Sequence, residues 1–268
     1  MSHLLISIAV HAYALAALGY LACLVRQARA LVTGARVLTG FGLGMHGVGL
    51  FQLFAAQGGG PVGMAQGFSF LAFLLLALFL FLDLRYRRPV FGAFLMPLSV
   101  AALLPAVLMH GADSVLPAEV RQPLLWVHIS IALLGLAAFG IAAGVAVMYL
   151  VMEREVKSKH FGLLFTRLPS LEFLDTLNRR LVIWGFIALS ITLATGGLFS
   201  SAEGPAWTWE PKQVATVVGW CFFGGLVSAR VFAGWQGKRT AFLTMAGFGI
   251  VLVSFLSSYD LGPTVGVR

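Results

Sequence analysis

Eight long apolar blocks constrain this chain more than any other feature of its sequence. An α-helix needs about 20 apolar residues to cross the hydrocarbon core of a bilayer. Only 10% of the residues are charged and the mean hydropathy is +0.93, whereas soluble domains carry about a quarter charged residues. The sequence therefore predicts an all-α integral membrane protein, one transmembrane domain over 1–268 with about eight spans at roughly 3–25, 37–57, 64–83, 90–110, 124–151, 180–201, 213–233 and 240–258.

The basic residues predict how the spans are oriented. Fifteen of the 18 Lys and Arg residues lie in four alternating stretches, 26–36, 84–89, 152–180 and 230–239. Because cytoplasmic loops carry such an excess, we expect both termini on the outer, periplasmic side of a bacterial inner membrane. The ten acidic residues divide evenly between the two sides, so the net charge of +8 reflects topology and contact with the lipid bilayer. With no basic soluble domain, nucleic-acid binding is not expected.

The longest hydrophilic stretch, 152–180, is expected to be a cytoplasmic connector. Leu171, Leu174, Leu177 and Leu181 fall on one helical face within and just beyond it. Such a stripe is also compatible with an amphipathic helix lying on the inner membrane surface.

Histidines within the blocks are the first functional candidates, because ionisable residues are rare and costly in a membrane. His11 lies in the first block, His46 near the middle of the second and His128 just inside the outer end of the fifth. Neutral imidazole ligates haem iron and also forms hydrogen bonds between helices. The glycine-rich run 40–49 around His46 leaves room for a flat ligand or for a neighbouring helix, so both roles stay open.

A second candidate is the outward loop 202–213, which combines tryptophans with charged residues. It contains Trp207, Trp209, Glu210 and Lys212. An interfacial aromatic belt needs no acid and base beside a proline, whereas tryptophan faces can stack on a planar macrocycle. Lys212 is suited to neutralise a haem propionate, and Glu210 to pair with Lys212 or to lie at the start of the next helix.

These residues resemble a known family. The segment from Trp207 to Gln213 is similar to the tryptophan-rich WWD segment of the haem-handling cytochrome c assembly proteins, the CcsA, ResC and CcmC group. The segment 126–132, which includes His128, resembles their histidine-bearing segment, and 234–241 resembles the end of the same domain. His46 in a glycine-rich second span is similar to the shorter HemX and YpjD-type relatives.

The resemblance implies a bundle that holds or presents haem b at its outer face during cytochrome c maturation. It implies that His128 is an axial ligand of the iron and that Trp207, Trp209, Glu210 and Lys212 form the covering loop. It also implies haem and other cytochrome c maturation proteins, or an apocytochrome, as partners.

The chain departs from the family pattern at several positions. Glu203 stands where a tryptophan is expected, and no histidine follows His160. The second axial ligand is therefore expected to be His46 or His11, or to come from a partner. These departures argue against full haem-lyase activity.

Two other functions stay open: a membrane scaffold without a cofactor and a small-solute transporter. The missing C-terminal histidine favours the scaffold, and the near absence of acidic residues from the blocks argues against a transporter. The sequence carries no catalytic triad, zinc spacing, phosphate loop or dinucleotide fingerprint. We therefore expect the protein not to be an enzyme in its own right.

Overall fold

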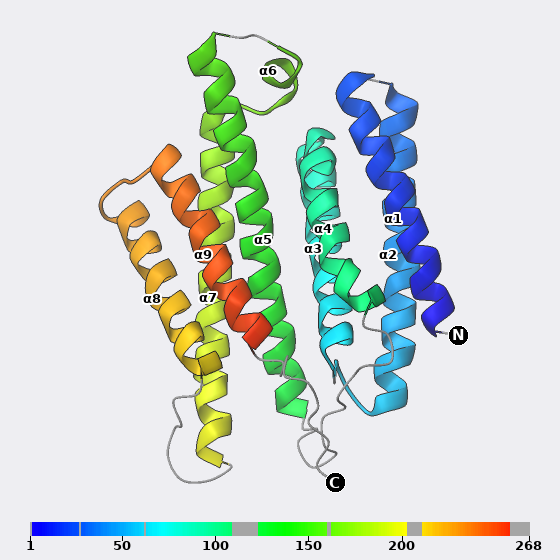
Figure 1. The fold of residues 1–268 in the computed structure, drawn as a ribbon, viewed down its shortest axis with the longest axis vertical. Coiled ribbons are helices and arrows are strands. Elements are labelled where there is room, and N and C mark those ends of the chain that lie inside the picture. The colour runs from blue at the N-terminus through cyan, green and yellow to red at the C-terminus, as the bar shows by residue number, and fades with distance from the viewer. Residues whose placement is uncertain are drawn as a thin grey trace.

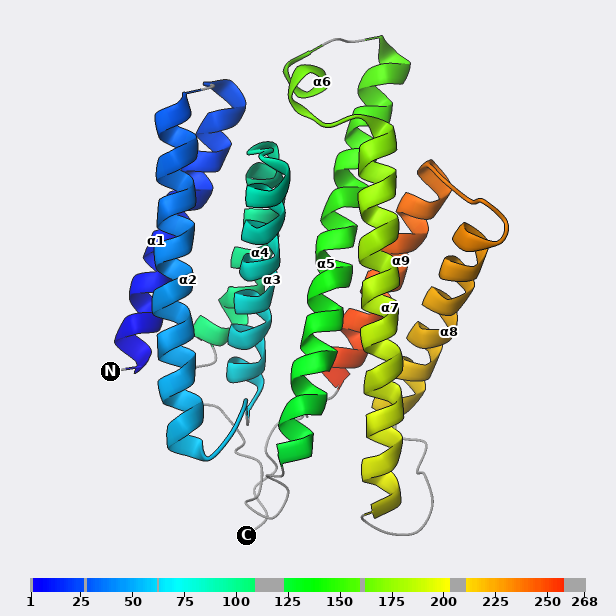
Figure 2. The same ribbon diagram turned by 180° about the vertical axis from the view of Figure 1, so that it is seen from behind.

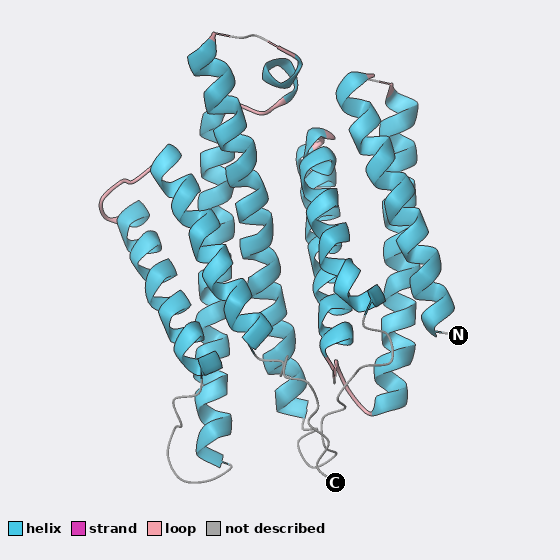
Figure 3. Cartoon of the chain, viewed as in Figure 1, coloured by secondary structure: helices cyan, strands magenta, loops and turns pink. Residues whose placement is uncertain are grey.

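The computed structural model describes residues 2–26, 28–61, 63–108, 123–159, 162–202 and 211–257. Within these ranges the regular structure is entirely helical (Figures 1 and 3). The helices are α1 (Ser2–Val25), α2 (Arg29–Gln57), α3 (Met64–Tyr86), α4 (Val90–Leu108), α5 (Pro123–Ser158), α6 (Leu163–Arg167), α7 (Leu171–Ala202), α8 (Pro211–Val231) and α9 (Lys238–Ser257). All but α6 are long and apolar enough to cross a membrane, which gives eight candidate spans in the part of the chain described.

Successive spans run in opposite directions, so the connections alternate between two ends of the bundle (Figures 1 and 2). The α1–α2, α3–α4 and α8–α9 turns and the α5–α7 connection lie at the upper end in Figure 1. These connections belong to the four stretches that hold most of the Lys and Arg residues, so we call this the arginine-rich end. The α2–α3 turn lies at the other end, here called the opposite end. Which end faces the cytoplasm stays a prediction.

The connection between α5 and α7 is much shorter than the expected connector. α5 continues to Ser158 and α7 begins at Leu171, so the leucine stripe belongs to the sixth span. Leu174 and Leu177 are buried, in agreement with the packing of α7 along α5. Asn178 donates a hydrogen bond of 2.7 Å to the carbonyl of Ala142 on α5. These contacts allow α7 to begin at Leu171, although polar residues interrupt the apolar pattern in its first turns.

The chain folds into an N-terminal half, α1–α4, and a C-terminal half, α5–α9. α1 packs along α2 and α3 along α4, while α7 and α9 pack on α5. The halves join mainly through α5 and α3. Glycines on α5 allow the two halves to pack closely. A Cβ at Gly140 would lie 3.2 Å from Leu75, and one at Gly144 would overlap Leu95. The Gly-x-x-x-Gly pair of α5 therefore packs within the chain.

Candidate functional site

The imidazole of His128 is oriented by a neighbouring helix. Its Nδ1 lies 2.7 Å from the hydroxyl oxygen of Thr195 on α7. That hydroxyl also lies 2.8 Å from the carbonyl of Ile191 and 3.1 Å from that of Thr192. When its hydrogen is donated to one of these carbonyls, the oxygen accepts the N–H of His128 Nδ1, and the imidazole lone pair is then on Nε2. Metal-ligating histidines are held in this way, with one ring nitrogen donating to a neighbour and the other directed to the metal.

Small residues set the distance between the two helices at this site. A Cβ at Gly135 would lie 3.0 Å from that of Ala188. α5 and α7 therefore approach each other closely about 10 Å along α5 from His128. A Cβ at Gly196 would lie 3.3 Å from Cε1 of His128. His128 itself is only partly buried. The site is thus a half-open imidazole beside a helix surface without a side chain.

Trp126 joins the two halves of the protein close to His128. Its indole ring lies on the α2–α3 turn, where a Cβ at Gly59 would overlap it and one at Gly60 would lie 3.0 Å away. The turn begins at Gly58, whose φ of 75° lies in the left-handed region that favours glycine. The Trp126 segment that resembles the haem-handling proteins therefore has a packing role at the opposite end.

The imidazole of His46 is enclosed in the N-terminal half. Its Nε2 lies 2.9 Å from the hydroxyl of Ser69 on α3, and its Nδ1 lies 3.3 Å from the hydroxyl of Tyr13 on α1. The side chain of His46 has no exposed surface, and Phe73 packs edge-on against its ring. A Cβ at Gly42 would lie 2.7 Å from the Tyr13 ring. These contacts favour a hydrogen bond between helices, and a ligand to His46 would have to displace one of them.

The structure does not bring the three candidate histidines together. His128 lies two residues from Trp126, about 3 Å along its helix, while His46 lies 11 residues from the end of α2, about 16 Å. Since Trp126 touches the α2–α3 turn, the two histidines differ in depth by roughly 13 Å, whereas metal–imidazole bonds are about 2 Å long. His11 lies on the exposed face of α1, with Nδ1 2.7 Å from the carbonyl of Ser7.

The predicted tryptophan loop is attached at the same end as His128. Trp207, Trp209 and Glu210 lie outside the described residues, and of Lys212 only its place in the first turn of α8 is described. The loop follows α7, the helix that carries Thr195, and precedes α8. Thr195 is seven residues from the end of α7, about 10 Å along the helix. The loop therefore follows directly on the helix whose Thr195 contacts His128.

A buried polar network in the C-terminal half was not predicted from the sequence. The Arg230 side chain is only 1% exposed. It donates a hydrogen bond of 2.8 Å to the side-chain oxygen of Asn178, and it lies 3.6 Å from the Asp175 carboxylate. That carboxylate also accepts the backbone N–H of Gly237, whose φ is 80°. Asp175 lies outside the leucine face of its helix, so nothing in the apolar pattern indicated this contact. Gly237 donates to Asp175 from a left-handed backbone that favours glycine.

The N-terminal half holds a buried carboxylate, that of Asp83. Arg36 donates from two nitrogens to its two oxygens, at 2.6 and 3.1 Å, and Tyr20 donates at 3.1 Å. The Asp83 side chain has no exposed surface. An acid satisfied this fully is built as a structural ion pair, so its position gives no support to ion-coupled transport.

Comparison with known proteins gives one consistent result. The model of the cytochrome c assembly protein family matches residues 36–264. The chain is 28% identical over 218 residues to the cytochrome c biogenesis protein CcsA of Guillardia theta, covering 74% of this chain and 72% of the relative. It is 28% identical over 208 residues to CcsA of Prochlorococcus marinus (strain MIT 9301), covering 68% and 67%. Over 102 residues it is 38% identical to CcsA of a Synechococcus strain, covering 38% and 30%. The chain belongs to the cytochrome c assembly protein family.

Proposed function

We propose that this multi-pass membrane protein handles haem in cytochrome c biogenesis, holding or presenting b-type haem at the opposite end of its bundle. Membership of the cytochrome c assembly family supports the general role. The single observation that carries the site is the oriented imidazole of His128, whose Nδ1 is 2.7 Å from Thr195. The residues there fit the cofactor, because the lone pair of a neutral imidazole is what ferrous or ferric haem requires of an axial ligand.

Each residue of the site has a separate task in this proposal. His128 supplies Nε2 to the iron, and Thr195 keeps the proton on Nδ1 and fixes the plane of the ring. Trp207 and Trp209 cover the macrocycle and exclude water, while Lys212 neutralises a propionate. Glu210 pairs with Lys212 or lies at the start of α8. The bound haem supplies the redox and electrophilic chemistry, and the protein supplies binding and orientation.

The second axial position is proposed to be filled from outside the described bundle. His46 and His11 are separated from His128 in this structure, as described above. One further candidate from this chain is His110, in the segment 109–122 between α4 and α5. A partner, such as another maturation protein or the apocytochrome, is the other source. A haem held by one protein ligand is suited to being passed on.

The test is an absorption spectrum of the detergent-purified protein, oxidised and then reduced with dithionite, with a pyridine haemochrome assay to identify the haem type. We expect a sharp reduced spectrum of the b type. Expression of a His110→Ala variant then separates the two sources of the second ligand, since only a ligand from this chain alters the spectrum on substitution. A protein that stays colourless after expression with excess haem would contradict the proposal and leave the cofactor-free scaffold.

A further inference from the structure

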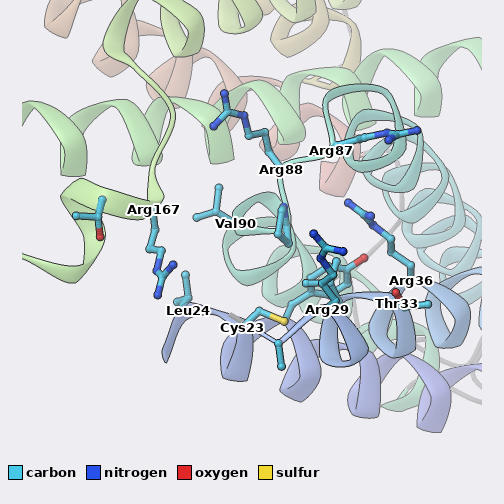
Figure 4. A pocket seen from close by; sticks show the side chains of 14 residues that line it. Cys23, Leu24, Arg29, Thr33, Arg36, Arg87, Arg88, Val90 and Arg167 are labelled. Atoms are coloured by element: carbon cyan, nitrogen blue, oxygen red, sulfur yellow. The ribbon is translucent and has the colours of Figure 1, made fainter. Parts of the chain in front are cut away.

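A pocket of about 670 Å³ lies at the arginine-rich end, far from the proposed haem site (Figure 4). It is enclosed by the end of α1, the start of α2, the α3–α4 turn and α6. Its wall includes Arg29, Arg36, Arg87, Arg88 and Arg167. Apolar side chains such as Leu24, Val32 and Val90 line the rest, and no Asp or Glu is among the described residues that line it.

Among the described residues, most of the positive charge of this pocket has no ion-pair partner. Arg36 is paired with the buried Asp83. None of the ion pairs between described residues involves Arg29, Arg87, Arg88 or Arg167. Figure 4 shows Arg29 and Arg36 extending from α2 toward the turn that carries Arg87 and Arg88. Arg87 and Arg88 extend from that turn in different directions (Figure 4). Guanidinium groups that line one cavity repel each other, and the repulsion is relieved when an anion binds among them.

The backbone at Arg87 supports a role for its side chain. Arg87 is the residue at which α3 ends, and its φ of 51° and ψ of 41° lie in the left-handed region. Its backbone N–H donates a hydrogen bond of 2.8 Å to the carbonyl of Asp83. Glycine is the preferred residue at such a helix end, and an arginine is disfavoured there by its Cβ. The chain nevertheless places a charged side chain at this point of the pocket wall.

Arg167 of α6 supports the same conclusion independently. Its Nε is buried and has no hydrogen-bond acceptor among the described residues. A buried guanidinium N–H is costly when it lacks an acceptor. Since Arg167 also lines the pocket, a rotation of its side chain would bring this N–H to an oxygen atom of a bound anion.

We infer that this pocket binds a phosphate-bearing anion, with Arg29, Arg87 and Arg167 donating to the phosphate oxygens. The planar fork of arginine matches the geometry of phosphate. Basic pockets between transmembrane helices bind the headgroups of anionic lipids, and the apolar side of the wall at Leu24 and Val32 suits the glycerol end of such a lipid. A soluble phosphate compound has the same chemistry, so the experiment must separate these two sources.

The experiment is native mass spectrometry of the full-length protein after delipidation in detergent. One arm adds diphosphatidylglycerol, a second adds zwitterionic phosphatidylcholine, and a third adds inorganic pyrophosphate to the diphosphatidylglycerol sample. We expect wild-type protein to retain diphosphatidylglycerol well above phosphatidylcholine. In Arg29→Gln/Arg167→Gln we expect the affinity to fall about tenfold or more, because two charge-assisted contacts are lost.

Two variants separate the pocket from general charge and from misfolding. Arg87→Gly removes a guanidinium group from the pocket and also places glycine, the favoured residue, at a left-handed backbone position. It should therefore lower the retention of diphosphatidylglycerol without lowering the melting temperature. The matched control is Arg85→Gln/Arg239→Gln, which removes two exposed charges at the same end but none from the pocket. We expect the control to retain the lipid as wild type does, and the spectrum of the haem site to be the same in every variant.

The outcomes decide both the site and the source. If pyrophosphate displaces diphosphatidylglycerol from wild type but leaves lipid bound elsewhere on the protein, the site recognises phosphate itself and takes a soluble anion. If pyrophosphate leaves the adduct intact, the lipid headgroup is the ligand. Equal loss of lipid in the pocket variant and in the control, or no anion retained by wild type, would overturn the inference. These results are independent of whether the proposed haem function holds.

Discussion

The two halves of this protein each contain a histidine within the membrane span, and they surround it differently. In the N-terminal half, His46 has no exposed surface and its two ring nitrogens face Ser69 and Tyr13. In the C-terminal half, His128 is partly exposed, and its Nδ1 lies 2.7 Å from the hydroxyl oxygen of Thr195. The difference teaches that position within a membrane span does not identify a ligand. A partly exposed imidazole near the end of its helix is better suited to bind iron than one enclosed between three helices.

The halves also share one feature, an ion pair at the arginine-rich end in which one partner is buried. Asp83 is the buried partner of Arg36 in the first half, and Arg230 is the buried partner of Asp175 in the second. Each pair joins two consecutive helices, α2 with α3 and α7 with α8. The halves are therefore stabilised alike at this end and differ at the other, where the proposed haem site lies in the second half only.

The largest effect is expected from breaking the first of these ion pairs. Asp83→Asn leaves the partly buried Arg36 side chain, which is 25% exposed, without its counter-ion, and loss of one partner of such a pair costs up to about 3 kcal/mol. We expect a clearly lower midpoint of thermal unfolding in detergent. The matched control is Glu153→Gln, which removes a pair whose lysine is 67% exposed and should change stability by about 0.5 kcal/mol at most. Equal shifts in the two variants would contradict the structural role of Asp83.

The next effect concerns the residue that orients His128. Thr195→Val keeps the shape of the side chain but removes the acceptor for the Nδ1 proton, and loss of such a partner typically lowers metal affinity about 10- to 100-fold. Haem titration of apoprotein should measure this change. Thr192→Val is the control, because its hydroxyl bonds only the carbonyl of Ala188 on its own helix among the contacts described. If both variants bind haem as wild type does, Thr195 does not orient a ligand.

A smaller effect is expected where the halves meet at the opposite end. Gly59→Ala places a methyl group in the volume of the Trp126 ring, and overpacking of this kind costs about 1–3 kcal/mol. We expect lower thermal stability and a change in tryptophan fluorescence. Gly34→Ala is the control, since nothing lies within 4 Å of its Cβ position. An unchanged fluorescence in Gly59→Ala would show that the contact with Trp126 is not maintained.

The smallest effect on stability is expected at His46. His46→Leu fills a similar volume but removes two hydrogen bonds, and hydrogen bonds between membrane helices contribute about 0.6 kcal/mol each on average. We expect a loss of about 1 kcal/mol in unfolding free energy. The Tyr13→Phe variant, which keeps the imidazole and removes only one bond, should lose about half as much. A larger effect of Tyr13→Phe would point to another role for the tyrosine.

The eight spans and their alternation could be predicted because they depend on composition along the chain. The apolar blocks must match the thickness of a bilayer, and the basic residues mark alternate connections, so neither needs knowledge of which helices touch. α7 begins at Leu171, before the expected start of the sixth span at 180, because Glu172, Asp175 and Arg179 interrupt the apolar pattern without ending the helix. Only the leucine stripe, read as one face of a longer helix packed on α5, was available to correct it.

The partners of the candidate histidines could not be predicted, since they depend on contacts between helices. Ser69 and Tyr13 have no pattern that pairs them with His46, and Thr195 lies 67 residues from His128. The sequence gives the residue types for a haem site, but the fold decides which imidazole is enclosed and which is oriented. The separation of His46 from His128 follows only from the packing of Trp126 on the α2–α3 turn.

The central claim is that haem is held at the end of the bundle that carries His128. The most direct measurement is a pair of reduced-minus-oxidised absorption spectra, one of His128→Leu and one of His46→Leu, recorded on protein purified in the same detergent and normalised to protein concentration. We predict that His128→Leu loses the b-type spectrum and that His46→Leu keeps it. Loss of the spectrum in His46→Leu with full retention in His128→Leu would contradict the account and place the haem in the N-terminal half.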